Sequence, residues 1–217
     1  MDKELQQLQQ LFNDGKVLVQ KCGIGKVNAA LGAQRMINEF HPDCIISSGC
    51  AGGNGDDIQV QDVVVSTELA YHDVYCGMAI DSSTLYGQVQ GLPARFAADP
   101  YLLRKSEELK MESEKLREEA GIEFPTLNTG LIVTGDWFVD TKEKMREIIG
   151  HFPEARAVDM ESAAIAHACY INKVPFISFL VISDVPLRDT NASQYHNFWD
   201  TVADRSFQVT RHFVESL

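Results

Sequence analysis

Asp184 is a candidate catalytic or binding residue, because it lies just beyond an apolar run at residues 174–182. Such a run is typical of a strand buried on both faces of a parallel sheet. In open α/β sheets ligands bind beyond the carboxyl ends of the strands, so Asp184 is expected to lie at a binding site. A helix cap or a turn is the alternative, since Ser183 and Asp184 both favour those positions.

Three further carboxylates, Asp136, Asp159 and Glu161, also follow predicted strands. We expect them on the same sheet edge as Asp184. Glu161 lies in the first turn of a predicted helix, where the helix dipole is expected to keep its carboxylate ionised. An ionised carboxylate can accept hydrogen bonds from both hydroxyls of a ribose diol. The alternative is a simple helix N-terminal charge.

The elements that would position these residues alternate along the chain. Apolar spacing predicts strands at 16–22, 43–48, 58–72, 127–134, 155–158 and 174–182, and helices at 1–12, 27–40, 101–120, 141–149, 160–171 and 195–217. This alternation predicts an α/β fold with a mostly parallel sheet covered on both faces. A length of 217 residues suits a single domain, residues 1–217.

A Gly-x-Gly-Lys turn at residues 23–26 joins the first predicted strand to a helix. It lacks the spacing and the Ser or Thr of a P-loop, and it lacks the third glycine of a dinucleotide-binding loop. A tight turn whose glycines let the backbone pass close to a neighbour is the favoured interpretation. A turn that faces a ligand remains the alternative.

Composition excludes several classes of partner. A formal charge of −12 disfavours nucleic acid and anionic membranes, whose recognition depends on Lys and Arg. The run at 174–182 is too short to span a bilayer, and no signal peptide is recognised, so no membrane partner is expected. The five cysteines show no metal-binding or disulfide spacing, which predicts no metal site and mostly buried, reduced thiols in a cytoplasmic protein.

Several of these segments together carry a resemblance to a known family. They resemble the nucleoside phosphorylase superfamily, and within it the bacterial 5'-methylthioadenosine/S-adenosylhomocysteine nucleosidases. The resemblance covers nearly all of residues 16–217 and implies a three-layer α/β/α sandwich with a mixed, mostly parallel central sheet, and no cofactor. The segments are AVDMESAA at 157–164, VISDV at 181–185, CGIGKV at 22–27, SGCAGG at 48–53 and YHD at 71–73.

The resemblance implies hydrolysis of the N-ribosidic bond of an adenosine-like nucleoside through an oxocarbenium-like state. Asp184 matches the general acid that protonates adenine at N7, and Ser183 matches the residue that orients it. Burial should raise the pKa of Asp184 and so keep its proton near neutral pH. Glu161 matches the acceptor for the ribose hydroxyls, with Met160 packed against the sugar.

The same resemblance assigns the rest of the substrate site. Phe138 matches the ring that stacks on adenine, and the Val139 backbone matches the group that reads the base edge. Ala51 and Gly52 lie in the loop beside the attacking water. Tyr195 matches an aromatic residue beside the ribose.

The base for the attacking water is expected near the first residue of the chain. The family places a Glu in a segment similar to AMEEE, which Met1-Asp2-Lys3-Glu4 fits, so Glu4 is the candidate base and Met1 a residue lining the site. The apolar strand that precedes this segment in the family has no counterpart before Met1. We therefore expect Glu4 to lack an anchor, and this chain to hydrolyse 5'-methylthioadenosine less well than a version with an upstream strand.

Two other functions stay open at this point. A phosphorylase would need Arg or Lys to hold phosphate, whereas the loop after Gly49 carries Asp56 and Asp57 and no Arg. A nucleoside-binding protein that has lost catalysis is the second alternative. The resemblance also implies a homodimer in which loop 74–96 helps to complete the neighbouring pocket.

Overall fold

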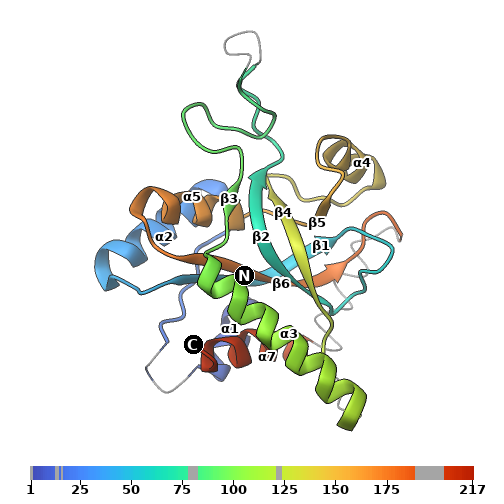
Figure 1. Ribbon diagram of the computed structural model, residues 1–217. Coiled ribbons are helices and arrows are strands. Elements are labelled where there is room, and N and C mark those ends of the chain that lie inside the picture. The colour runs from blue at the N-terminus through green and yellow to red at the C-terminus, as the bar shows by residue number, and fades with distance from the viewer. Residues whose placement is uncertain (1, 13–14, 16, 78–82, 121–123, 189–202) are drawn as a thin grey trace.

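A six-stranded sheet forms the centre of the computed structural model, which describes all residues except 1, 13–14, 16, 78–82, 121–123 and 189–202 (Figure 1). The strand order is β3-β2-β4-β5-β1-β6. The strands are β1 (Ile45–Gly53), β2 (Val63–Tyr71), β3 (Phe96–Ala97), β4 (Leu127–Thr134), β5 (Ala155–Asp159) and β6 (Phe176–Asp184). β4 has its predicted bounds, whereas β1 continues through the glycines that were expected to follow it.

The sheet is mixed, as predicted, and it closes on itself. β1 runs parallel to β6, and β4 runs parallel to both β2 and β5, whereas the β1–β5, β2–β3 and β2–β6 pairs are antiparallel. The closing pair joins Val63–Val65 of β2 to Phe179–Val181 of β6. A closed, barrel-like sheet surrounded by helices therefore describes the fold better than the expected three-layer sandwich.

The helices pack around this sheet in three groups (Figure 1). α2 and α5 pack on each other and on one side of the sheet, and α1, α3 and α7 form a second group. α4 contributes Met145 and Ile148 to a third apolar cluster with β4 and β5. The helices are α1 (Asp2–Leu11), α2 (Lys26–Phe40), α3 (Pro100–Ala120), α4 (Lys142–His151), α5 (Ser162–Asn172) and α7 (Ala203–Glu215).

β6 is the most enclosed strand at the site. All its residues from Phe176 to Ser183 are buried, as the apolar run predicts for a strand covered on both faces. It lies between β1 and β2, which explains why both of its faces and both of its edges are covered. Its last residue, Asp184, is the first that leaves this apolar environment.

Two predicted strand segments are wrong. Residues 17–22 form no strand and pair with none of the described strands, and Leu18 is half exposed. Residues 58–62 form turns before β2, because the Asp62 carboxylate accepts from the Gln59 amide at 2.8 Å and closes the chain locally. Local side-chain hydrogen bonds of this kind compete with strand pairing and are not visible in apolar spacing.

Other predictions are corrected in detail. The helix predicted at 160–171 begins at Ser162, and residues 195–202 of the last predicted helix lie outside the described residues. Only Cys169 among the five cysteines is buried, while Cys22, Cys44, Cys50 and Cys76 are partly exposed. Within the described residues, no helix combines the length and the apolar character needed to cross a membrane.

Candidate active site

The site lies where strands of opposite direction meet at their carboxyl ends. Gly52, near the end of β1, is paired with Val158 of β5 on one side and with Asp184 of β6 on the other. A side chain at Gly52 would contact Val158 and Pro186 at 3.2–3.3 Å, so a glycine keeps these three strand ends close together. The ends of β1, β5 and β6 thus converge on one point, although β5 runs against β1.

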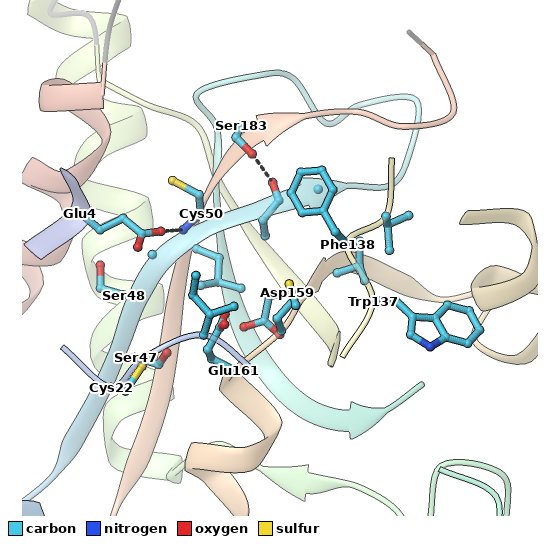
Figure 2. Close-up of a pocket in the computed structure, with 18 of the residues that line it drawn as sticks. Glu4, Cys22, Ser47, Ser48, Cys50, Trp137, Phe138, Asp159, Glu161 and Ser183 are labelled. Carbon is cyan, nitrogen blue, oxygen red and sulfur yellow. Dashed lines mark hydrogen bonds between the residues drawn. The ribbon is translucent and has the colours of Figure 1, made fainter. Parts of the chain in front are cut away.

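A cavity of ≈ 200 Å³ opens at this junction (Figure 2). It brings together residues from α1, from three strand ends and from the segment after β4. Asp136, which was expected on the same edge, does not line it. The predicted site residues that do line it are Glu4, Ala51, Gly52, Phe138, Val139, Met160, Glu161, Ser183 and Asp184.

Met1 and Tyr195, the other two predicted site residues, lie outside the described residues. Among the described residues, no group of three or more His, Cys, Asp or Glu side chains is arranged to hold a metal ion.

Asp184 is held by its neighbour in the chain. The Ser183 hydroxyl donates to Asp184 Oδ1 at 2.7 Å and lies 3.3 Å from the Ala51 carbonyl oxygen (Figure 2). Burial raises the pKa of Asp184 to about 6, and the Ser183 hydrogen bond opposes this rise. The direction is the expected one, and it leaves a carboxyl group that can hold or release a proton near neutral pH.

Glu161 departs from the expected behaviour. Its carboxylate accepts from the Gly25 amide at 2.9 Å, but burial, followed by the charge of Asp159, raises its pKa to about 7. The prediction that the helix dipole keeps Glu161 fully ionised is therefore wrong. Glu161 precedes α5 and makes no side-chain cap hydrogen bond, so the dipole effect on it is weaker than burial.

Asp159 takes the capping role that Glu161 does not fill. Its Oδ2 accepts from the Ser162 amide at 2.8 Å, and its Oδ1 accepts from the Thr134 hydroxyl. Thr134 Oγ1 in turn accepts from the Ala163 amide at 2.9 Å. The first amides of α5 are thus satisfied from β4 and β5, and this fixes the direction in which Glu161 enters the cavity.

Glu4 is anchored, contrary to expectation. It projects from α1 into the cavity, where its Oε1 accepts from the Cys50 amide at 3.1 Å (Figure 2). α1 is held in turn by Leu8 and Leu11, which pack against the apolar cluster shared by β6 and α7. The packing of α1 and the Cys50 amide therefore position Glu4 in the cavity.

The segment after β4 forms an aromatic side of the cavity. Trp137, Phe138 and Val139 all line it, and the Phe138 side chain is 54% exposed. Trp137 packs edge-on against the buried ring of His72, with ring centroids 5.2 Å apart. Phe138 is therefore a partly exposed aromatic residue on a segment that Trp137 and His72 support.

Sequence reasoning missed several lining residues. Cys22, Ser47, Ser48, Cys50 and Trp137 line the cavity and were not predicted to do so. No pattern in the sequence indicated that the two cysteines face the cavity. Burial raises the pKa of Cys22 to about 11 and that of Cys50 well above its ordinary value, so both stay protonated thiols.

The fold is that of a known family. The chain belongs to the phosphorylase superfamily, whose family model matches residues 7–215.

Within that superfamily the chain is similar to curated proteins named 5'-methylthioadenosine/S-adenosylhomocysteine nucleosidase. One from Geobacillus sp. (strain WCH70) is 36% identical over 209 residues, which cover 95% of this chain and 83% of the relative. Another, from Exiguobacterium sp. (strain ATCC BAA-1283 / AT1b), is 39% identical over 207 residues, covering 93% of this chain and 81% of the relative.

Solved structures agree with this grouping. The nucleosidase of that name from Neisseria meningitidis, in complex with methylthio-immucillin-A, superposes with a TM-score of 0.85 at 35% identity, covering 100% of this chain and 96% of that one. The Colwellia psychrerythraea nucleosidase in complex with adenine gives a TM-score of 0.84 at 29% identity, with coverage of 100% and 92%.

Proposed function

We propose that this chain hydrolyses the N-ribosidic bond of 5'-methylthioadenosine, S-adenosylhomocysteine or a related 5'-modified adenosine and releases adenine. One observation carries the proposal. A partly buried, Ser183-bonded Asp184 with a raised pKa shares one cavity with a second carboxylate, Glu161, and with the aromatic ring of Phe138. Named relatives bound to adenine and to methylthio-immucillin-A support the same substrate class.

Asp184 acts as the general acid in this proposal. It donates its proton to N7 of adenine while the bond between C1' and N9 breaks, so the base leaves neutral and positive charge develops on the ribose. The acid must be protonated to act, and burial at the end of β6 supplies that by raising its pKa. Ser183 orients the carboxyl group.

The ribose and the base contact different sides of the cavity. Glu161 accepts from the ribose hydroxyls with the lone pairs that the Gly25 amide leaves free, and Met160 packs against the sugar. Phe138 stacks on adenine, and the backbone of Val139 reads the base edge. Tyr195 is proposed as an aromatic neighbour of the ribose by resemblance alone.

The attacking water lies near Glu4 in the proposed mechanism. Glu4 takes a proton from water, and the resulting hydroxide adds to C1' of the oxocarbenium-like state. Ala51 and Gly52 border this position at the end of β1, and Met1 is proposed as a further lining residue by resemblance. Faster turnover by a version with an upstream strand stays a prediction of the resemblance.

Phosphorolysis is the second candidate because the superfamily contains phosphorylases. Phosphate would need cationic partners, and among the described residues no Arg or Lys lines the cavity, whereas Glu4, Asp159, Glu161 and Asp184 do. Four carboxyl groups in the cavity disfavour the binding of an anionic second substrate such as phosphate. The lining therefore supports water as the nucleophile.

Adenine release in phosphate-free buffer tests the proposal. We expect turnover of 5'-methylthioadenosine without phosphate, and a loss of at least ~10²-fold in kcat for Asp184→Asn, because an amide cannot give up the proton. A transition-state analogue should still bind the variant, which shows that it is folded. Activity that requires phosphate, or that survives Asp184→Asn, would refute the assignment. A wild-type chain that binds the nucleoside without any turnover would instead be a nucleoside-binding protein.

We also propose a homodimer. α2 presents Val27 and Leu31 to solvent, 70% and 65% exposed, and Ile24, which lines the cavity, is 52% exposed just before them. Tyr75 and Leu85, in the described part of loop 74–96, are also exposed. A second copy of this chain packed on these apolar side chains would cover the mouth of the cavity.

A further inference from the structure

Three charged residues that do not line the cavity form a cluster in which they are joined to one another by hydrogen bonds: Lys26, Asp73 and Asp136. The Lys26 ammonium donates to Asp73 Oδ1 at 2.6 Å, and the Asp136 amide donates to Asp73 Oδ2 at 2.8 Å. The Lys26 amide donates to Asp136 Oδ1 at 2.8 Å. The cluster joins the start of α2, the end of β2 and the segment after β4, and the proposed catalytic steps do not use it.

The cluster holds the glycine turn at residues 23–25 in one conformation. Gly25 has a φ of 85°, and a side chain there would lie 2.9 Å from Asp136 Oδ1. Only glycine fits this combination of positive φ and close approach. The second glycine of the Gly-x-Gly-Lys motif is thereby explained by the carboxylate that it approaches.

Two successive amides of this turn point to two different carboxylates. The Gly25 amide donates to Glu161 inside the cavity at 2.9 Å, and the Lys26 amide donates to Asp136 outside it at 2.8 Å. The two amides belong to successive peptide planes that meet at the Cα of Gly25, whose φ is 85°. Holding the second plane at Asp136 therefore limits the orientations that are open to the first. Asp136 is therefore coupled to Glu161 through one residue of backbone.

The cluster is enclosed enough to act as an anchor. The Asp73 side chain is 9% exposed and the Lys26 side chain 22%, and the Lys26 ammonium also lies 5.5 Å from the centre of the Tyr71 ring. The Asp136 side chain is 49% exposed, so it can be changed without opening a cavity in the core. Asp136 is thus the member of the cluster that is best suited to a test.

We propose that Asp136, with Lys26 and Asp73, is a positioning residue for Glu161: it fixes the Gly25 amide as a donor and so directs the remaining carboxylate lone pairs to the ribose hydroxyls. The role of Glu161 rests on the proposed function. Asp159, Glu4 and Cys22 face Glu161. The groups that face Asp136 are Asp73, Lys26, Tyr71 and His72. The Gly25 amide opposes the rise in the pKa of Glu161 that burial and Asp159 cause.

The test compares Asp136→Ala with Asp136→Asn on two substrates. We expect Asp136→Ala to lower kcat/KM about 10-fold for 5'-methylthioadenosine, because a misplaced acceptor weakens the hold on the ribose. With the analogue that lacks the 3' hydroxyl, the loss should be under about 2-fold, since the misplaced acceptor has less to bind. Asp136→Asn should restore most of the activity, because its amide oxygen can still accept from the Lys26 amide.

Asp140→Ala is the matched control. It removes an exposed carboxylate from the same segment, where Asp140 pairs with Lys144 at 2.8 Å, and should leave both substrates unaffected. Equal losses on both substrates for Asp136→Ala, or no loss on either, would overturn the proposal.

Amide hydrogen exchange tests the coupling independently of catalysis. Asp136→Ala should speed exchange at Gly25 and Lys26, and Asp136→Asn should change it much less. Unchanged exchange at Gly25 in the alanine variant would overturn the proposed coupling even if the wild-type chain released no adenine. Wild-type inactivity toward 5'-methylthioadenosine would count against the proposed function instead.

Discussion

At the scale of single residues, the site depends on two partly buried carboxyl groups whose pKa values both lie near neutrality. The pKa of Asp184 is raised to about 6 and that of Glu161 to about 7, in each case mainly by burial. The proposed chemistry needs Asp184 protonated and Glu161 ionised. Asp184 is mostly protonated below about pH 6, and Glu161 is mostly ionised above about pH 7, so both conditions are met together only in part of the molecules.

A bell-shaped pH profile follows from these two values. We expect kcat/KM for adenine release to peak at about pH 6.5, midway between them, because activity falls below pH 7 as Glu161 gains a proton and above pH 6 as Asp184 loses one. Glu161→Gln should be slower and should move the acidic limb to lower pH, since its amide does not titrate and Glu4 is then the remaining group that must be ionised. A wild-type kcat/KM that still rises at pH 8 would contradict the assignment of Asp184 as the acid.

The sequence supported one of these pKa predictions and not the other, for a physical reason. Asp184 follows an apolar run, so its burial and the direction of its shift could be predicted. Glu161 precedes a helix, which suggested a stabilised charge, but its burial and its distance from Asp159 depend on how α5 packs against β5. Tertiary contacts of that kind leave no local pattern in a sequence.

At the scale of elements, the strand ends that carry chemistry could be predicted, and their pairing could not. The end of β4 is at the predicted residue, and Asp159 and Asp184 are the last residues of β5 and β6. The antiparallel meeting of β1 with β5, and the closing pair of β2 and β6, join segments that are far apart in the chain. The resemblance to a family supplied the site residues that periodicity could not assign.

The start of α5 gives a test at this scale. Thr134→Val should destabilise the fold by roughly 1–3 kcal/mol, because it leaves the buried Ala163 amide and an oxygen of Asp159 without their partner. Urea unfolding with a constant slope measures this difference. Thr129→Val at a half-buried position of the same strand is the control, and equal stability of the two variants would show that the capping contact contributes little.

At the scale of the whole molecule, the exposed side chains of α2 make the oligomeric state testable. Light scattering at micromolar concentration should show a dimer, and the double variant Val27→Glu, Leu31→Glu should be a monomer with reduced adenine release, because two buried charges oppose association. Met111→Glu, at an exposed position on α3, should remain dimeric. A monomeric wild-type chain would rule the dimer out.

The two cysteines in the cavity have a consequence for its chemical durability. Alkylating agents and peroxides attack the thiolate, and a thiol whose pKa is about 11 is ionised in only about one molecule in 10⁴ at pH 7. Burial raises the pKa of Cys50 well above its ordinary value as well, and the nearby Glu4 carboxylate adds to the rise. The two thiols of this site should therefore tolerate alkylating electrophiles that would inactivate a cysteine-dependent enzyme.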